Sequence, residues 1–163
     1  MPIIYTTEHR CPLGRLVLEG DGRALTRIRL PGEKPAAATD GDTRHIRDSG
    51  PFTAVIAQLD EYFAGRRRKF ELPLAPSGTP FQLKVWRELR KIPYGRTITY
   101  AVLAHRAGNA AACRAVGAAN GRNPLPIIVP CHRVIGSDGS LTGFGGGLAA
   151  KRKLLELEGA PID

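Results

Sequence analysis

The chain has few cysteines, few aromatic residues and no long hydrophobic segment, and each shortage excludes a class of protein. Its 163 residues include three cysteines, one tryptophan and one methionine, and aromatic residues make up 6% of the chain. Three widely spaced cysteines form neither a disulfide framework nor a metal-binding pair, so we expect free thiols. No apolar segment reaches the ~20 residues that span a membrane, and the N-terminus has no basic start followed by a long apolar stretch. We therefore expect a cytoplasmic protein without a membrane partner.

Acidic residues are also scarce relative to basic ones. The chain carries 24 Lys and Arg residues against 15 Asp and Glu residues, which gives a net charge of +9. Residues 1–80 contribute +2 to this charge and residues 81–163 contribute +7. A basic surface favours polyanionic partners, so the second half is where we expect contact with nucleic acid. A solvated basic face without a partner fits the composition equally well.

The first part of the chain has the pattern of a small sheet followed by a helix. Three short apolar clusters within residues 1–30, with a Gly-Asp-Gly turn signal after the second, predict an antiparallel meander. Residues 31–51 are rich in Pro, Gly, Ala and Asp and have no periodicity, which predicts a surface loop. Apolar positions within residues 52–63 repeat with helical spacing, and Gly65 follows as a stop signal.

The second half has the pattern of a helical domain. A Thr-Pro pair at residues 79–80 is a typical helix start, and an apolar stripe follows it. Thr97 or Thr99 begins a short helix, and residues 110–120 predict another after a Gly-Asn turn. Two short helices joined by a tight turn are typical of a helix-turn-helix. The second of them is nearly all small residues, which fits close approach to a ligand or hydrophobic packing equally well.

The remainder of the chain contains an apolar run, a loop and a final helix. Residues 127–129 are consecutive apolar residues and predict a buried strand. Residues 136–147 are rich in glycine and predict a loop. Residues 148–158 predict a helix that Gly159 ends.

These elements predict an α+β fold with two domains. We expect an N-terminal domain of sheet and helix over residues 1–72, a linker rich in proline at residues 73–78, and a helical domain over residues 79–163.

One cysteine stands in a sequence context that favours chemistry. Cys131 follows the apolar run and directly precedes His132. The thiolate is the reactive form of cysteine, and a neighbouring imidazole lowers the pKa of the thiol. Side chains of consecutive residues often point apart, however, so a buried structural cysteine remains the alternative. Cys113 is interpreted as a packing residue of its helix.

The segment around Cys131 resembles the active-site signature of the O6-alkylguanine-DNA alkyltransferases, also called methylated-DNA–protein-cysteine methyltransferases. The resemblance rests on PCHRVIGSDGSLTGFGGGLAAKRKLLELEG, FQLKVWRELRKIPYGRTITYAVLA and RAVGAANGRNPLPIIVPCHRV. Together these segments cover almost all of residues 79–159. Residues 1–78 match more loosely, mainly through CPLGRLVLEGDG and the helix that ends in YFAG. The PCHRV core, with an Asn-Pro pair eight residues before the cysteine, is highly specific. The resemblance implies a ribonuclease-H-like N-terminal domain and a helical C-terminal domain.

The resemblance implies DNA repair by direct transfer of an alkyl group to Cys131. The alkyl donor is O6-alkylguanine in double-stranded DNA, and O4-alkylthymine is a second substrate. The transfer is irreversible, each molecule acts once, and no cofactor takes part. A helix-turn-helix in the minor groove flips the base out of the stack. A monomer without an obligate protein partner is implied, with clustering along DNA left open. The alternatives are a non-catalytic lesion-binding protein and a cysteine hydrolase. Family members of the non-catalytic type have another residue in place of the cysteine.

The resemblance also implies roles for individual residues. Cys131 is the alkyl acceptor, His132 is the base that takes the thiol proton through a water, and Glu158 orients His132. This is the logic of a catalytic triad with a cysteine nucleophile. Asn123 braces the turn under the site, and the Tyr100 hydroxyl donates to the departing guanine.

The implied DNA contacts lie on the helix-turn-helix. Arg114 fills the gap that the flipped base leaves, while Tyr100 faces the DNA and small residues allow the helix to approach closely. These small residues are Ala115, Gly117 and Ala118. The residues implied to line the pocket for the alkyl group and base are Pro126, Val134, Gly143, Phe144, Gly145 and Gly146.

Two features of the sequence depart from those of relatives. Phe144 stands where many relatives have tyrosine, so a hydroxyl contact at that position is absent. Some relatives carry a zinc site near the N-terminus, whereas the first 80 residues here hold Cys11, His9 and His45 without ligand spacing. We therefore expect no metal.

Overall fold

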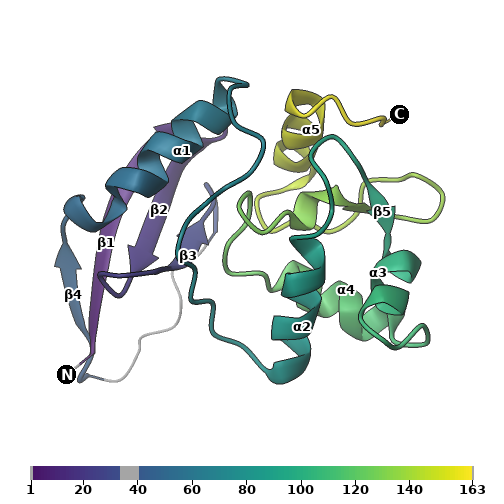
Figure 1. Cartoon of the computed structure of the whole chain (residues 1–163), viewed down its shortest axis with the longest axis horizontal. Coiled ribbons are helices and arrows are strands. Elements are labelled where there is room, and N and C mark those ends of the chain that lie inside the picture. The colour runs from purple at the N-terminus through teal and green to yellow at the C-terminus, as the bar shows by residue number, and fades with distance from the viewer. Residues whose placement is uncertain (1, 34–40, 163) are drawn as a thin grey trace. The chain divides into compact units, whose positions relative to one another are not determined.

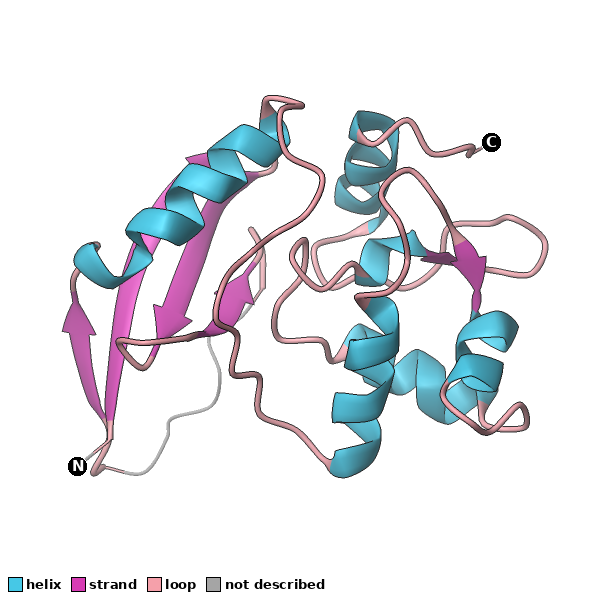
Figure 2. Ribbon diagram, in the orientation of Figure 1, coloured by secondary structure: helices cyan, strands magenta, loops and turns pink. Residues whose placement is uncertain are grey.

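The chain folds into two compact units, each with its own set of secondary-structure elements (Figure 1). The computed structural model describes residues 2–33 and 41–162. The first unit comprises Met1–Pro76 and the second comprises Ser77–Asp163. The described part of the first unit is a four-stranded sheet with an α-helix, and the second unit is mainly helical (Figure 2). The α+β fold predicted from the sequence is confirmed.

The sheet of the first unit has the strand order β3-β2-β1-β4. Its strands are β1 (Ile3–Cys11), β2 (Gly14–Gly20), β3 (Leu25–Arg29) and β4 (Arg44–Arg47). β1 and β2 are antiparallel, as are β2 and β3, whereas β4 runs parallel to β1. The predicted meander is confirmed for the first three strands. The fourth strand, which was not predicted, makes the sheet mixed because β4 runs parallel to β1.

The segment that contains β4 was expected to be a surface loop. This prediction over residues 31–51 was wrong in its second half, which holds β4 and a 3₁₀ turn at Gly50–Phe52; residues 34–40 lie outside the described part of the chain. Ile46 is the only apolar residue of β4 and pairs with Tyr5 of β1. The strand conformation of β4 thus depends on backbone pairing with β1, which no local pattern reveals.

Helix α1 (Thr53–Phe63) lies across one face of this sheet (Figure 1). Leu16 and Leu18 alternate along β2 and are buried, as the period of two in a strand requires. On the helix, Leu59 and Tyr62 are fully buried one turn apart. Packing these two apolar stripes together forms the core of the first unit.

The second unit is built from four α-helices in its described residues, namely α2 (Pro80–Leu89), α3 (Tyr100–Arg106), α4 (Cys113–Gly121) and α5 (Leu148–Leu157). Helix α2 begins where the Thr-Pro pair predicts. The Thr79 hydroxyl accepts a hydrogen bond from the Gln82 amide, and the Gln82 side chain accepts one from the Thr79 amide, which forms a capping box. Of the two threonines proposed for α3, Thr99 is the cap. Helices α3 and α4 pack on each other and on α2.

Two very short strands bring distant segments of the second unit together. β5 (Ile98–Thr99) and β6 (Val134–Ile135) pair in parallel, with Ile98 opposite Val134. β5 leads directly into Tyr100, and β6 directly follows Cys131–Arg133. This pairing, which no sequence pattern indicated, sets the start of α3 beside the Cys-His segment.

The apolar run before Cys131 is not a strand. Residues 127–129 are buried, as predicted, but they form a tight turn in which the Val129 amide donates to the Leu125 carbonyl at 2.8 Å. Ile127 has a φ of 75°, a left-handed conformation that a β-branched residue rarely adopts. The predicted strand was wrong because the run is too short to distinguish a buried strand from a buried turn.

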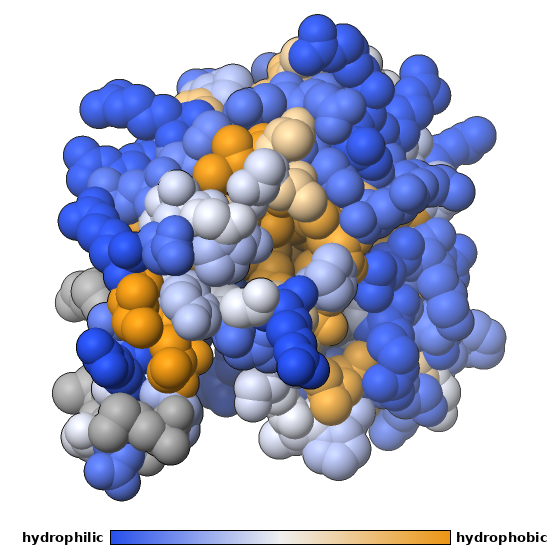
Figure 3. Space-filling view, turned by 60° about the vertical axis from the view of Figure 1, so that its left-hand side comes forward, coloured by the Kyte–Doolittle hydropathy of each residue, from blue (hydrophilic) through white to orange (hydrophobic). Residues whose placement is uncertain are grey.

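The surface carries isolated apolar side chains among charged ones. Large hydrophobic residues that remain exposed are Ile3, Phe81, Val102 and Leu148. The face drawn in Figure 3 is mostly hydrophilic, with small separate apolar areas. Scattered exposed apolar residues of this kind are normal for a folded protein. None of the helices within residues 2–33 and 41–162 has the length and hydropathy that crossing a bilayer requires.

Candidate active site

Cys131 begins a buried 3₁₀ turn, Cys131–Arg133, between the Ile127 turn and β6. The cysteine is 5% exposed, and the other two residues of the turn are buried as well. Pro130 precedes Cys131 and fixes the backbone at the entry of the turn. The Cys131 amide donates to the Val129 carbonyl at 2.8 Å, so the backbone of Cys131 is held close to the preceding segment.

Asn123 braces that preceding segment from both ends. Its side-chain oxygen accepts a hydrogen bond from the Leu125 amide at 3.0 Å, and its side-chain nitrogen donates to the Val129 carbonyl at 2.7 Å. The two bonds span the residues that include Ile127 with its strained backbone. A side chain that closes a turn in this way compensates for the cost of a left-handed β-branched residue.

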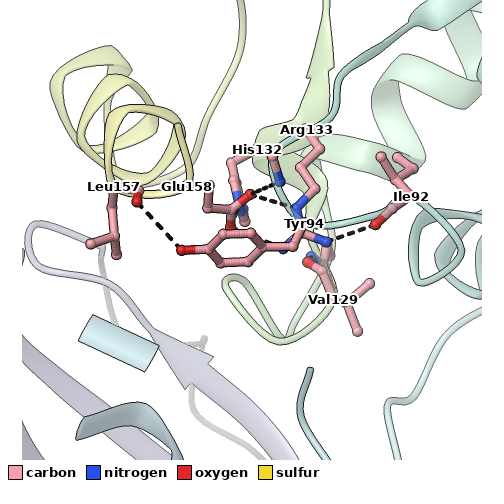
Figure 4. A network of polar contacts seen from close by, with 9 residues as sticks. Ile92, Tyr94, Val129, His132, Arg133, Leu157 and Glu158 are labelled. Atoms are coloured by element: carbon pink, nitrogen blue, oxygen red, sulfur yellow. Dashed lines mark hydrogen bonds and ion pairs between the residues drawn. The ribbon is translucent and has the colours of Figure 1, made fainter. Parts of the chain in front are cut away.

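His132 and Glu158 form a buried pair (Figure 4). The His132 Nε2 atom lies 2.8 Å from Glu158 Oε2, and both side chains are fully shielded from solvent. Glu158 stands at the C-terminal cap of α5, and its backbone faces Gly95, where a Cβ atom would lie 3.0 Å from the Glu158 carbonyl oxygen. Gly95 has a φ of 78°, so both space and conformation favour glycine there.

Arg133 binds the same carboxylate. Its Nε atom donates to Glu158 Oε1 at 2.8 Å and its Nη2 atom donates to Oε2 at 2.9 Å. The third nitrogen, Nη1, donates to the Ile92 carbonyl at 2.7 Å, and the guanidinium lies over the ring of Tyr94. Tyr94 in turn donates from its hydroxyl to the Leu157 carbonyl at 3.4 Å (Figure 4).

For Glu158 and for His132, burial and the hydrogen bond between the two side chains shift the pKa in opposite directions. Burial would raise the pKa of Glu158, but hydrogen bonds from His132 and Arg133 outweigh it and hold that pKa well below its usual range. Burial also lowers the pKa of His132, because desolvation disfavours the imidazolium. Glu158 counteracts this shift, whereas the positive charges of Arg133 and Lys151 reinforce it. At neutral pH the pair is therefore a carboxylate and a neutral imidazole.

Lys151 is a second buried cation beside the turn. Its ammonium donates to the Val134 carbonyl at 2.6 Å and to the Thr142 carbonyl at 2.7 Å. Burial lowers the pKa of Lys151 to about 8, and the negative charge of a Cys131 thiolate acts in the opposite direction. The two groups therefore interact electrostatically, so the ammonium favours ionisation of the sulfur.

The Tyr100 hydroxyl lies against the glycine-rich loop. It donates to the Thr142 carbonyl at 3.1 Å, and a Cβ atom on Gly143 would lie 3.8 Å from the hydroxyl oxygen. A Cβ atom on Gly117 of α4 would lie 3.9 Å from the Tyr100 ring. Tyr100 is thus packed between the loop and the second helix of the helix-turn-helix.

The residues expected to touch DNA lie on α4, except for Tyr100, which begins α3. Arg114, Ala115 and Ala118 of α4 are exposed, whereas Val116 and Ala119 of the same helix are buried. The exposed positions follow the helical period, so they share a face on which Arg114 stands beside two small side chains.

The residues expected to line a pocket divide into two groups. Pro126 and Val134 are buried, and Val134 packs within the paired strands β5 and β6. The glycine-rich loop supplies the others: Gly143 and Gly145 are exposed, and Phe144 and Gly146 are half-buried. The first group lies within a few residues of Cys131 in the chain. The second belongs to the loop whose Thr142 carbonyl accepts hydrogen bonds from Lys151 and Tyr100.

Two residues of this site carry no role in the sequence-based prediction. Arg133 and Lys151 are both charged, and charged residues are ordinarily solvated. A signal for Lys151 was present, because it falls at the helical spacing of the apolar residues Leu148 and Leu154 on α5. No comparable signal marks Arg133.

Comparison with known proteins places this geometry in a family. The model of the 6-O-methylguanine DNA methyltransferase DNA-binding domain matches residues 80–160, and that of the ribonuclease-like domain of the same proteins matches residues 3–76. The two matches together cover nearly the whole chain. The chain belongs to the 6-O-methylguanine DNA methyltransferase family.

Relatives from bacteria and archaea agree with this membership. The chain is 47% identical over 154 residues to a methylated-DNA–protein-cysteine methyltransferase of Mycobacterium tuberculosis, covering 93% of this chain and 92% of the relative. It is 44% identical over 158 residues to the protein of the same name from Methanosarcina acetivorans, covering 96% and 99%.

Solved structures of the family have the same fold. The crystal structure of the Mycobacterium tuberculosis O6-methylguanine methyltransferase matches with a TM-score of 0.86 at 45% identity, covering 98% of this chain and 96% of that one. A structure of that protein in complex with DNA matches with the same TM-score and identity, covering 98% and 95%. Membership in the 6-O-methylguanine DNA methyltransferase family thus extends over both units of the chain.

Proposed function

We propose that this protein repairs DNA by transferring the alkyl group of O6-alkylguanine to its own Cys131. The observation that carries the proposal is the buried 3₁₀ turn in which Cys131 is followed by His132, whose ring is bound to the carboxylate of Glu158. A nucleophile, a base and a group that orients the base are the three parts of a catalytic triad. The same chemistry applies to O4-alkylthymine, in which an alkyl group is likewise bound to an exocyclic oxygen of the base.

The reaction follows from the roles of these groups. His132 accepts the thiol proton of Cys131 through a water, and the resulting thiolate attacks the alkyl carbon. An S–C bond forms while the bond from the carbon to O6 breaks, and the electron pair of that bond remains on guanine. The Tyr100 hydroxyl stabilises the departing anion by hydrogen bonding, with help from backbone amides of the Gly143–Gly146 loop. The product is a thioether, which no hydrolytic step cleaves, so each molecule acts once.

Access to the lesion requires that the nucleotide leave the duplex, since a stacked base hides the alkyl carbon. The exposed small residues Ala115 and Ala118 allow the backbone of α4 to approach the minor groove, and Gly117 leaves room beside Tyr100. Arg114 fills the space left by the base. Phosphate contacts by the basic second half give affinity without regard to sequence, as repair requires. We propose double-stranded DNA as the partner and a monomer as the acting form.

Mass spectrometry tests the proposal directly. The protein is incubated with a duplex that contains one O6-methylguanine, and the intact mass of the protein is measured. The gain of one methyl group per chain, abolished in a Cys131→Ala variant, is the expected result. Repeated turnover with unchanged protein mass would instead indicate a cysteine hydrolase, and binding without either change would indicate a lesion sensor. Both of these results contradict the proposal.

A further inference from the structure

In the Cys131–Arg133 turn, called the catalytic turn below, every nitrogen of the Arg133 guanidinium donates a hydrogen bond. Its guanidinium donates through all three nitrogens, twice to Glu158 and once to the Ile92 carbonyl, and its side chain is 7% exposed. The guanidinium carbon lies 5.8 Å from the centroid of the Tyr94 ring (Figure 4). Five donors in a rigid plane match a carboxylate in two-pronged geometry, and arginine does not lose its proton in proteins. Glu158 therefore faces a permanent positive charge.

His132 and Arg133 share one oxygen of Glu158. Oε2 accepts from His132 Nε2 at 2.8 Å and from Arg133 Nη2 at 2.9 Å, while Oε1 accepts from Arg133 Nε. An ionised carboxylate only accepts hydrogen bonds, so the His132 Nε2 atom has to be the donor. In a neutral imidazole the other nitrogen, Nδ1, then carries the free lone pair.

Under the proposed function, the Nδ1 atom of His132 is the ring nitrogen that accepts the thiol proton. It is buried, and within the described part of the chain it has no hydrogen-bond partner. A buried polar atom without a partner costs free energy, so its presence in a native structure calls for an explanation such as a catalytic role. Accepting a proton from the neighbouring thiol is such a role.

We propose that Arg133 is a positioning residue of the alkyl-transfer reaction, which fixes the proton of neutral His132 on Nε2 and limits the affinity of Nδ1 for a further proton. The inference rests on the proposed function, because it assigns Arg133 a task only if His132 is the base. Arg133 acts through Glu158, which it keeps ionised and in part neutralises. Without the guanidinium, the whole charge of a buried carboxylate would act on the imidazole and favour the imidazolium, which cannot accept the thiol proton.

The charges that surround His132 allow the direction of the effect to be derived. Glu158 raises the pKa of His132, whereas burial, Arg133 and Lys151 lower it. Cys131 adjoins it in the same turn, and helix α2 packs on that turn, with Val85, Trp86 and Leu89 as its buried residues. Removing the positive charge of Arg133 therefore raises the pKa of His132, and the neutral base forms only at higher pH.

The test uses Arg133→Met, which preserves much of the side-chain volume, and Arg133→Lys, which preserves the charge but not the two-pronged geometry. Ring nitrogen resonances of His132 are followed by NMR over pH in the full chain and are identified by their loss in His132→Gln. Methyl transfer from free O6-methylguanine is measured over the same pH range, so that DNA binding does not enter. The matched control is Arg152→Met, at a half-exposed arginine of α5 that lies 4.0 Å from Glu156.

We expect the Nε2–H form in the wild type and in Arg152→Met. In Arg133→Met, the midpoint of the His132 titration and the acidic limb of the transfer rate move to higher pH together. The expected shift is about one pH unit, which is a tenfold loss of rate on that limb. The midpoint for Arg133→Lys is expected to lie between those of the wild type and Arg133→Met.

Three results would overturn the inference. They are the Nδ1–H form in the wild type, a folded Arg133→Met variant whose rate falls equally at all pH values, and an equal shift in Arg152→Met. If Arg133→Met does not fold, the wild-type tautomer and the Arg133→Lys profile still decide. A wild type that takes up no methyl group refutes the proposed function instead, while the tautomer continues to report on Arg133.

Discussion

The ammonium of Lys151 donates a 2.7 Å hydrogen bond to the Thr142 carbonyl, and the same oxygen accepts the Tyr100 hydroxyl at 3.1 Å. Lys151 also donates to the Val134 carbonyl at 2.6 Å. One buried cation thus ties the strand after the catalytic turn to the glycine-rich loop and, through a shared acceptor, to the hydroxyl proposed to stabilise the leaving guanine. The spacing between sulfur and hydroxyl depends on this lysine.

Replacing Lys151 with methionine should slow alkyl transfer. The carbonyls of Val134 and Thr142 lose their shared donor, so the loop and Tyr100 lose their fixed distance from Cys131. We expect the single-turnover rate on DNA containing O6-methylguanine to fall at least about tenfold, as when a preorganised donor is removed. Lys153→Met, an exposed lysine on the same helix, should react at the wild-type rate. Equal rates in all three proteins would contradict the positioning role of Lys151.

The same lysine should leave a signature in the pH dependence of stability. The pKa of Lys151 is about 8 in the folded protein and lies near its usual 10.5 in the unfolded chain. Between these values the unfolded state binds more protons, so the contribution of Lys151 to the free energy of unfolding increases as pH rises from 8 to 10.5. The comparison is urea unfolding of the wild type and Lys151→Met across this window. Parallel pH curves for the two proteins would show that the lysine is not desolvated.

Glu158→Gln should impair chemistry more than binding. The amide oxygen of glutamine can still accept hydrogen bonds, but the amide has no negative charge with which to stabilise an imidazolium at His132 or to balance the buried charge of Arg133. We expect transfer to slow by about 10²–10³ and the free energy of unfolding to fall by about 3 kcal/mol, as for a broken buried ion pair. Affinity for unmodified duplex DNA, measured by fluorescence anisotropy, should change little. An unaltered transfer rate would remove Glu158 from the mechanism.

Arg114→Ala should separate the duplex reaction from the chemical step. The side chain is exposed on α4 and makes no part of the Cys131 turn, so it acts only where a base must be held out of the stack. Transfer from duplex DNA should fall about tenfold or more, since unstacking costs a few kcal/mol. Transfer from free O6-methylguanine should remain at the wild-type rate. A similar loss with both substrates is the result that the proposed role does not allow.

Local signals in the sequence were sufficient for the helices of the second unit. The Thr79 cap and the Thr99 cap both act within a few residues, so the sequence around them determines where α2 and α3 begin. The α+β class could be predicted from the pattern of strands and helices. The role of Cys131 could be predicted because its motif is local. Strand β4 could not be predicted, since its segment has a single apolar residue and becomes a strand only beside β1.

The charges of the site could be predicted only in part. Cys131, His132 and Glu158 were marked by their motif, although neither their burial nor the 2.8 Å contact of His132 with Glu158 follows from spacing. Arg133 was overlooked because its partners, Glu158 and the Ile92 carbonyl, lie 25 and 41 residues away. A cation of this kind looks solvated until the tertiary structure shows what it contacts.

Trp86 offers an optical readout of the DNA-binding helix. It is the one tryptophan of the chain, it is 3% exposed, and its indole nitrogen donates to the Ala119 carbonyl of α4 at 2.8 Å. Indole emission depends on polarity and hydrogen bonding, so any displacement of α4 would alter the fluorescence of the unmodified protein. The chain therefore carries a built-in fluorophore attached to the helix that is proposed to enter the minor groove, and engagement of a damaged duplex can be timed without a label.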